Sequence, residues 1–161
     1  MLYYSLVRSI LKYCSVVWRP HYATHILRLE RVQKRFLWHL AFCEGKSKRL
    51  PSYRARLDYF KMQPLTARSD MADAMLLFKL LRNKIDCPGL LNLVRLRAPS
   101  RYPRNKITPF CPPLRRTVLG ANSPIPRSCR ILNNYSDLID VHQDNVNKLY
   151  KVIKDIPIAK I

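Results

Sequence analysis

Three carboxylates and a histidine stand close together near the end of the chain, in the segment SDLIDVHQD. They are Asp137, Asp140, His142 and Asp144. Carboxylates that converge on two divalent ions about 4 Å apart can carry metal-dependent phosphoryl transfer. These side chains lie in the least basic part of the chain, however, where helix capping and solvation account for them. The sequence also contains no GxSxG, no HExxH and no glycine-rich phosphate loop, so we expect no catalytic residue and no enzyme activity.

Histidine and cysteine pairs at helical spacing are the candidates for a zinc site. His21 and His25 are four residues apart, as are His39 and Cys43, and Cys14 precedes both pairs. Ligands at i and i+4 share a helix face and can bind zinc tetrahedrally. The spacings match no zinc-finger pattern, so we expect packing or interface histidines, with no metal and no cofactor. The five cysteines are odd in number and form no CxxC pair, which favours packed, reduced thiols in a nuclear or cytoplasmic compartment.

The segment ILRLERVQKRFLWHL has the pattern of an amphipathic helix whose polar side is cationic. Drawn at 100° per residue, the side opposite its apolar stripe carries Arg28, Arg31, Lys34 and Arg35, with Glu30 alone opposing them at the edge. Like charges at i+3 and i+4 cost stability unless something acidic neutralises them. Contacts with phosphates would release counterions and make binding steeply salt-dependent.

Two apolar residues, Leu27 and Trp38, fall on the same cationic side. Trp38 can stack on a base or a sugar, or it can lie against protein. A neighbouring helix that covers both residues is an equally good interpretation, and the sequence leaves the choice open. Since no zinc finger, RNP pair or basic zipper is present, contacts with nucleic acid are expected to reach its backbone without reading its bases.

Further cations extend this candidate surface in two other segments. The loop CEGKSKRLPS contributes Lys46, Lys48 and Arg49. The proline-rich segment that follows contributes weaker candidates, namely Arg101, Arg104, Arg115 and Arg116.

The elements that position these residues are mostly helices, so the predicted fold class is mainly α. Apolar stripes predict a first helix over residues 2–18 and a second that begins near Thr24, together an antiparallel helical hairpin. The first stripe consists of Tyr3, Leu6, Val7, Ile10, Leu11, Cys14, Val17 and Trp18. The second consists of Ile26, Leu29, Val32, Phe36, Leu37 and Leu40.

Capping and proline signals predict the remaining elements. Ser52 caps a short helix over YRARLDYF, and Thr66 opens a central apolar helix through ARSDMADAMLLFKLLRNKI. Pro88 starts a short helix. Seven prolines between Pro99 and Pro126 predict an extended crossing segment, with short strand pairings around KITPF and RRTVL.

A C-terminal helical unit begins at Ser123-Pro124 and ends in a helix through NVNKLYKVIK, whose stripe is Val146, Leu149, Tyr150 and Ile153. The expected domain organisation is a helical region over residues 1–94, a basic proline-rich segment over 95–123 and a helical tail over 124–161.

The chain is strongly basic, with 30 Lys and Arg against 10 Asp and Glu and a formal net charge of +20. Residues 1–68 hold 14 basic and 3 acidic residues, whereas residues 131–161 hold 4 of each. A folded chain with such self-repulsion usually has a polyanionic partner, either nucleic acid or an acidic membrane surface. A membrane span is not expected, because Arg8 and Lys12 interrupt the N-terminal apolar run.

The stretch LYYSLVRSILKYCSVVWRPHYATHILRLERVQKRFLWHL resembles the segment that follows the catalytic palm in reverse transcriptases of jockey-like non-LTR retrotransposons. The shared pattern is SLVR.IL.Y.SVVW.P followed by I..LE.VQ.RFL. Later pieces fit in order, namely FKLL.N.ID.P.LL, then PSRYPRN, then RRTVLGANSPIPRSCRILNNYSDLIDV. The resemblance spans nearly the whole chain and departs at Ser9, where proline is common, and at Cys14, where a small residue is common.

The resemblance implies the thumb and tail of an RNA-directed DNA polymerase, a helical region that holds the primer–template duplex against the palm. The family's aromatic–x–Asp–Asp turn is absent from this sequence, so no catalytic residue is carried over. The expected function is non-catalytic binding of an RNA–DNA or DNA duplex by its backbone, with the missing palm as a further partner. Two alternatives remain open: a protein-interaction module that docks through Leu27 and Trp38, and a decayed transposon remnant without a selected function.

Overall fold

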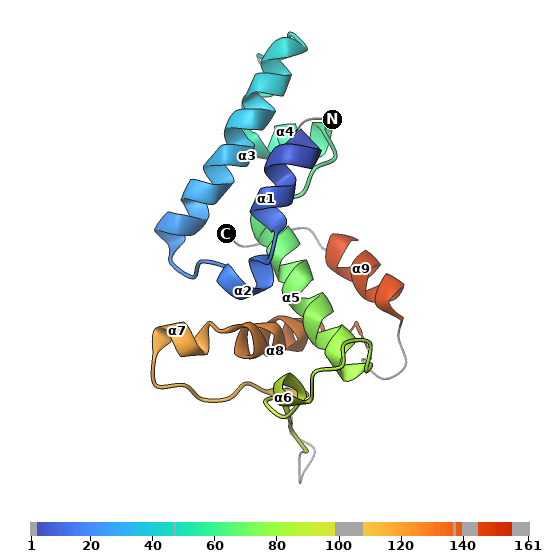
Figure 1. The fold of residues 1–161 in the computed structure, drawn as a ribbon. Coiled ribbons are helices and arrows are strands. Elements are labelled where there is room, and N and C mark those ends of the chain that lie inside the picture. The colour runs from blue at the N-terminus through green and yellow to red at the C-terminus, as the bar shows by residue number, and fades with distance from the viewer. Residues whose placement is uncertain (1–2, 47, 99–107, 137, 140–144, 156–161) are drawn as a thin grey trace. The chain divides into compact units, whose positions relative to one another are not determined.

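The computed structural model describes residues 3–46, 48–98, 108–136, 138–139 and 145–155, and its described elements are mainly helical (Figure 1). This confirms the predicted fold class. The chain forms two compact units, Met1–Ser69 and Asp70–Ile161. The division falls within helix α5 (Leu65–Leu81), whereas both predicted domain boundaries, after residues 94 and 123, fall inside the second unit.

The first unit begins with a broken helix beside α3 (Figure 1). A π-helical turn, η1 (Tyr3–Val7), leads into α1 (Arg8–Lys12), and α2 (Ser15–Trp18) follows after a break. Cys14 adopts a left-handed conformation with φ 46° at this break. A left-handed residue without a glycine's freedom interrupts the helical hydrogen-bond ladder. The prediction of one continuous helix to Trp18 is therefore wrong.

The apolar stripe predicted for this helix is mostly exposed. Tyr3 is buried and its ring stacks on Phe36 with centroids 3.9 Å apart and planes at 7°. In contrast, Leu6, Ile10 and Val17 are 59%, 73% and 72% exposed. Helical periodicity identified the apolar face correctly, but no described element covers most of it, so its assignment to the core is wrong.

Helix α3 (Ala23–Cys43) confirms the long second helix, with its buried face rotated from the prediction. Its N-cap is Tyr22, and Thr24 lies inside the helix. The buried residues are Gln33, Leu37 and Ala41, while Val32 from the predicted stripe is exposed. The rotation follows from α4, because that helix packs along the Gln33 side of α3.

Helix α4 (Tyr53–Tyr59) starts where the sequence predicts, since the Ser52 hydroxyl accepts a hydrogen bond from Arg54 N at 3.3 Å. Arg56 is buried and ties the preceding loop to the helix. Its Nε donates to the Leu50 carbonyl at 2.8 Å and its Nη2 to the Pro51 carbonyl at 2.7 Å. These bonds fix the loop between α3 and α4 and hence the spacing between the two helices.

The second unit is organised around the later turns of α5, which confirms that this helix is the central one of its core. The helix ends at Leu81, earlier than predicted, and Asn83 then takes a left-handed conformation with φ 53°. The buried core contains Met71, Ala74, Leu77, Phe78, Leu80, Phe110, Ile125, Cys129, Leu132, Ile139, Leu149 and Ile153.

Short elements surround this core. Pro88 is the first residue of α6 (Pro88–Leu91), as predicted, and β1 (Arg95–Leu96) pairs antiparallel with β2 (Phe110–Cys111) in the register Arg95↔Cys111. The predicted RRTVL strand is wrong, because Thr117 accepts a hydrogen bond from Gly120 N and caps α7 (Val118–Ala121). Residues 99–107 of the predicted crossing segment lie outside the described residues.

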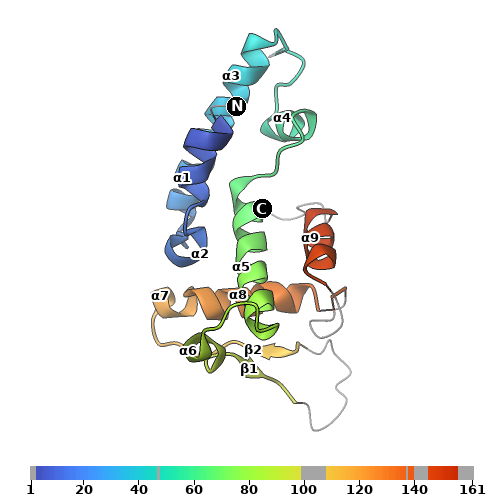
Figure 2. The ribbon, with the colours of Figure 1, turned by 45° about the vertical axis from the view of Figure 1, so that its right-hand side comes forward.

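Helix α8 (Pro124–Asn134) begins at Ser123-Pro124 as predicted and lies over the strand pair (Figure 2). The Asn133 amide bonds both backbone groups of Phe110, at 3.0 and 2.8 Å. Helix α9 (Val146–Asp155) confirms the predicted final helix. Its Leu149 and Ile153 are buried, whereas Tyr150 of the predicted stripe is exposed.

A buried ion pair joins two helices of the second unit. Asp73 of α5 is fully buried, and its carboxylate accepts from Arg127 of α8 twice, at 2.7 and 3.0 Å. A third Arg127 nitrogen donates to the Asn122 carbonyl at 2.8 Å. Two parallel bonds between a planar guanidinium and a carboxylate fix orientation as well as distance. No local sequence pattern predicts this pair, whose members are 54 positions apart.

The cysteines differ sharply in environment, which predicts their reactivity. Cys14 and Cys43 are exposed, whereas Cys129 is fully buried and burial raises the pKa of its thiol to about 11. Because the thiolate is the nucleophile, Cys129 is expected to stay unreacted at pH 8 while the two exposed cysteines are labelled within minutes. Timed alkylation followed by peptide mass spectrometry measures this. Labelling in denaturant is the control, and equal labelling of all five cysteines in the native protein would contradict the expectation.

Candidate nucleic-acid interface

A groove of about 560 Å³ runs along α3 in the first unit, with α4 forming its other wall. Its lining combines an apolar part with several cations. The lining residues are Leu27, Glu30, Arg31, Lys34, Arg35, Trp38, Tyr53 and Arg56. Three of the four cations predicted on α3, together with both apolar residues predicted beside them, thus line one concave surface.

The four cations predicted on α3 all lie on the exposed side of this helix. Arg28, Arg31, Lys34 and Arg35 are all exposed. Their order at i, i+3, i+6 and i+7 places them on adjacent turns of one helix, as helical geometry requires. Among the described residues, no ion pair joins any of the four to an acidic side chain. Their charges therefore add along the surface.

Glu30, the acidic residue predicted to oppose these cations, is turned inward. Its carboxylate accepts from Leu65 N at 3.2 and 3.1 Å, which caps the first turn of α5. The Tyr53 hydroxyl also donates to Glu30. Burial and the neighbouring Glu30 carboxylate raise the pKa of Tyr53, which keeps that hydroxyl protonated as a donor. An acid at a helix N-terminus is stabilised by the exposed N–H groups there, so Glu30 serves the fold.

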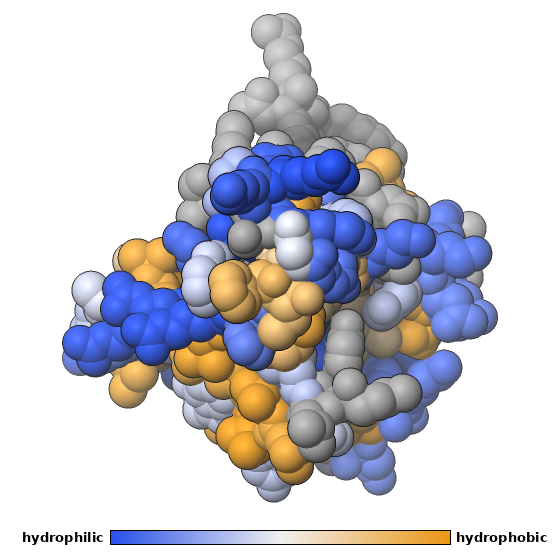
Figure 3. Space-filling model, turned by 90° about the horizontal axis from the view of Figure 1, so that it is seen from above, coloured by the Kyte–Doolittle hydropathy of each residue, from blue (hydrophilic) through white to orange (hydrophobic). Residues whose placement is uncertain are grey.

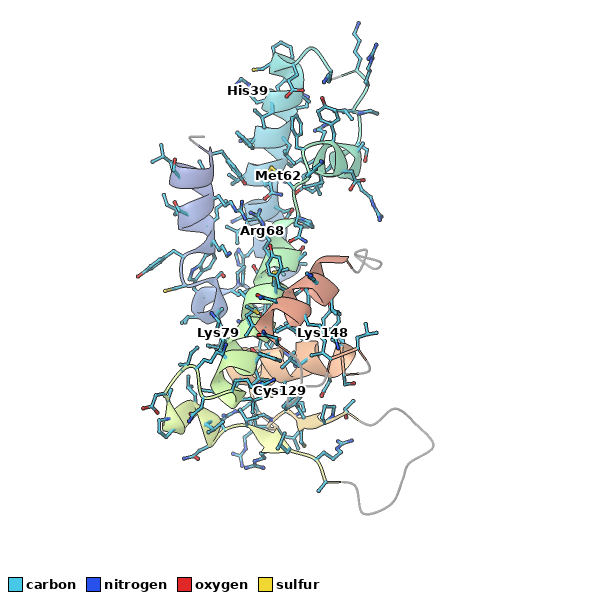
Figure 4. The ribbon with its side chains drawn as sticks, turned by 90° about the vertical axis from the view of Figure 1, so that its right-hand side faces the viewer. His39, Met62, Arg68, Lys79, Cys129 and Lys148 are labelled. Carbon is cyan, nitrogen blue, oxygen red and sulfur yellow. The ribbon has the colours of Figure 1, made fainter. Side chains whose placement is uncertain are left out.

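A buried polar cluster supports the groove from below. Gln33 is fully buried, and its amide nitrogen donates to the Gln63 carbonyl at 2.9 Å and to the Tyr53 hydroxyl at 3.3 Å. Its oxygen accepts from Tyr3 at 3.3 Å and from buried Arg68, which lies early in α5 (Figure 4). One amide thus connects η1, α3, α4 and the start of α5.

Replacing Gln33 with Leu is expected to lower the free energy of unfolding by roughly 2–4 kcal/mol, because it removes the amide oxygen that accepts a hydrogen bond from the buried Arg68 charge. Thermal unfolding followed by circular dichroism measures the change. Gln63→Ala is the matched control, since only the backbone carbonyl of Gln63 accepts from Gln33. A Gln33→Leu variant as stable as the Gln63→Ala control would show that the cluster adds no stability.

Trp38 lies in the groove and is 51% exposed, so no helix of the described first unit covers it. Its indole stacks on Phe42 one turn further along α3, with centroids 5.6 Å apart and planes at 16°. Leu27 is also exposed at the other end of the groove. Seen from above, the described part of the molecule exposes apolar residues beside strongly hydrophilic ones (Figure 3). Within the first unit, therefore, no neighbouring helix buries Leu27 and Trp38.

The cations predicted in the loop after α3 are less suited to binding phosphates, because one of them is already paired. Lys46 pairs with Glu44 at 3.4 Å and lies over the Tyr59 ring at 4.5 Å, so part of its charge is already neutralised. Hydrogen bonding to Tyr59, and secondarily to Glu44, raises the pKa of Lys46. Lys48 and Arg49 are exposed in the same loop.

The remaining candidates belong to the second unit. Arg115 and Arg116 are exposed before α7. Arg101 and Arg104 lie outside the described residues, as do Asp137, Asp140, His142 and Asp144.

The histidine and cysteine pairs considered as metal candidates are part of no larger cluster among the described residues. His39 Nε2 and Cys43 Sγ are 3.6 Å apart near the end of α3 (Figure 4), while His21 packs on Tyr22 with centroids 4.1 Å apart. In the described ranges, nowhere do three His, Cys, Asp or Glu side chains gather as a metal site would need. Likewise, none of the described helices has the length and apolar character needed to cross a bilayer.

Tyr53 and Arg56 line the groove although nothing in their sequence context predicts a functional role. Both project from α4, a helix recognisable from its cap and its apolar pattern. A local pattern could not reveal their position, because it depends on how α4 packs against α3.

No protein-family model, no curated protein and no solved structure matches this chain.

Proposed function

We propose that the first unit binds nucleic acid without catalysis, by holding phosphates of an RNA–DNA or DNA duplex along α3. The observation that carries the proposal is the row Arg28, Arg31, Lys34 and Arg35, exposed on one helix face with its single neighbouring acid turned inward. Arginine and lysine on such a face attract phosphates irrespective of base sequence.

The resemblance to the thumb and tail of jockey-like non-LTR retrotransposon reverse transcriptases supports the same proposal. In that family the corresponding region grips the primer–template duplex behind a palm. The net charge of +20 agrees with a polyanionic partner, because self-repulsion of that size is relieved by neutralising phosphates. On this proposal the chain is a binding region, and nucleotide incorporation requires a palm supplied by other sequence.

The test is the salt dependence of duplex binding. Four phosphate contacts should give a slope of log K against log salt of roughly −3 to −4, since each contact contributes about −0.9 on B-DNA. Fluorescence anisotropy with two blunt duplexes of unrelated sequence measures the slope and the sequence preference together. A flat slope, or no binding at low salt, would overturn the proposal. A strong preference for one sequence would show that bases are read.

A second candidate function is protein docking through the N-terminal helices. Here the supporting observation is the exposed apolar face of η1, α1 and α2, which includes Leu6, Ile10 and Val17. Several large apolar side chains exposed on neighbouring helical turns favour an interaction site. If the partner is a polymerase palm, a purified palm from the resembled family should bind the chain, and Ile10→Asp with Val17→Asp should abolish that binding while leaving duplex affinity unchanged.

A further inference from the structure

We infer that the groove between α3 and α4 holds one unpaired nucleotide of the bound nucleic acid, with its base on Trp38 and its phosphates on Arg31, Lys34 and Arg35. This inference rests on the proposed function, because it concerns the same partner. The inferred ligand differs from that of the proposed function, because it is a single-stranded stretch next to a duplex and not the duplex alone.

Trp38 offers a flat aromatic surface where a base can stack. The side chain is 51% exposed, and Phe42 stacks on it at an interplanar angle of 16°, which restricts the orientation of the indole. A preoriented ring loses little conformational freedom when a ligand binds. Stacking of a base on an aromatic side chain tolerates any base, since every base has a π face.

The groove has a size suited to a nucleotide. Its volume of about 560 Å³ lies within the 300–1,000 Å³ range typical of small-molecule sites. A base inside a duplex has both faces covered by its neighbours and presents only its edges. An unpaired base can place a face on Trp38 whereas a base inside a duplex cannot, so the inferred ligand is single-stranded nucleic acid.

The charges around Trp38 favour an anionic ligand over an apolar peptide. Arg31, Lys34 and Arg35 line the same groove, and the lining acid Glu30 is engaged by Leu65 N and Tyr53. An apolar peptide placed there would desolvate these cations without pairing them, which is costly. A nucleotide supplies both features: its base has the flat surface that stacks on Trp38, and its phosphodiester carries the negative charge.

The chain offers a clean spectroscopic probe, because it contains only two tryptophans. Trp18 lies in α2, where its indole donates to the Tyr13 carbonyl, outside the groove. The Trp18→Phe variant thus leaves Trp38 as the sole tryptophan. Its fluorescence is titrated at low salt with an eight-nucleotide oligo(dT), an abasic oligomer with the same number of phosphates, and a blunt duplex.

The expected result is quenching of Trp38 by oligo(dT) and not by the abasic oligomer. Oligo(dT) should also bind roughly five- to 150-fold more tightly than the abasic oligomer, the contribution of one stacked base. Trp38→Leu and Trp38→Phe leave no tryptophan in this background, so their affinities are measured by fluorescence anisotropy of end-labelled oligomers. Trp38→Leu should reduce the oligo(dT) affinity to the abasic level, and Trp38→Phe should restore part of the difference. Circular dichroism checks that each variant is folded.

The contrary outcomes separate the two proposals. If oligo(dT) and the abasic oligomer bind equally and Trp38 is not quenched, the nucleotide inference is overturned while duplex binding still supports the proposed function. If none of the three ligands binds at low salt, the proposed function fails and the inference fails with it. Equal loss of duplex and oligo(dT) affinity in Trp38→Leu would likewise overturn a base-specific role for Trp38.

Discussion

Replacing Arg31, Lys34 and Arg35 together with alanine is expected to remove roughly three units from the salt slope of duplex binding, about one for each phosphate that is no longer neutralised. The unsubstituted chain should bind the duplex more tightly than this variant, and the ratio of the two affinities should fall about 40-fold between 50 and 200 mM salt. All three side chains are exposed and none carries a hydrogen bond of the buried cluster, so folding should be unaffected. Fluorescence anisotropy at four salt concentrations measures the slope.

The matched control removes three exposed cations from the second unit, with Lys84, Arg95 and Arg97 replaced by alanine. It changes the net charge by the same amount at a different place. If affinity depends on total charge alone, the salt slope falls equally in both triple variants, and the α3 surface is then no specific site. A fall confined to the α3 variant supports a local interaction with phosphates.

Asp73→Ala is expected to reduce stability more than any other single substitution proposed for this chain. It would leave Arg127, which is 9% exposed, without the carboxylate that accepts two of its hydrogen bonds. Breaking a buried ion pair from one side costs about 3–5 kcal/mol, because the remaining charge stays desolvated. For a domain of 60–100 residues this corresponds to a fall in melting temperature of at least about 12 °C. Thermal denaturation followed by circular dichroism measures it.

Two variants make this result interpretable. Asp86→Ala removes an exposed acid from the same unit and should change stability by less than about 0.5 kcal/mol. The double variant Asp73→Leu with Arg127→Met replaces the pair by apolar groups and should recover most of the stability, because neither charge is then buried alone. An Asp73→Ala variant as stable as Asp86→Ala would contradict a structural role for the pair.

Much of the local structure could be predicted from the sequence, because it depends on short-range rules. Ser52 caps α4, Pro88 and Pro124 start their helices, and the apolar run of α5 forms the core of the second unit. In each case the deciding interaction lies within a few residues or within one helical period. The cationic side of α3 was predictable for the same reason, since helical spacing alone places its members.

Other features depend on tertiary structure. Gln33 looks like a surface residue in sequence, yet it is fully buried because Tyr3, Tyr53, Gln63 and Arg68 converge on its amide. Asp73 and Arg127 carry no local sign of their pairing, since 54 positions separate them. Such interactions depend on which elements meet, and no periodicity within one element specifies that.

The N-terminal apolar stripe and the α3 groove also show what residue spacing can predict and what depends on packing between helices. Residue spacing was enough to establish that both helices have an apolar side and that α3 has a cationic one. It could not establish that Leu6, Ile10 and Val17 stay uncovered, that Glu30 turns inward to cap α5, or that α4 converts a flat face into a groove around Trp38. Those outcomes required the packed chain, because a helix's own sequence sets where each side chain points, whereas its burial depends on the neighbour that packs there.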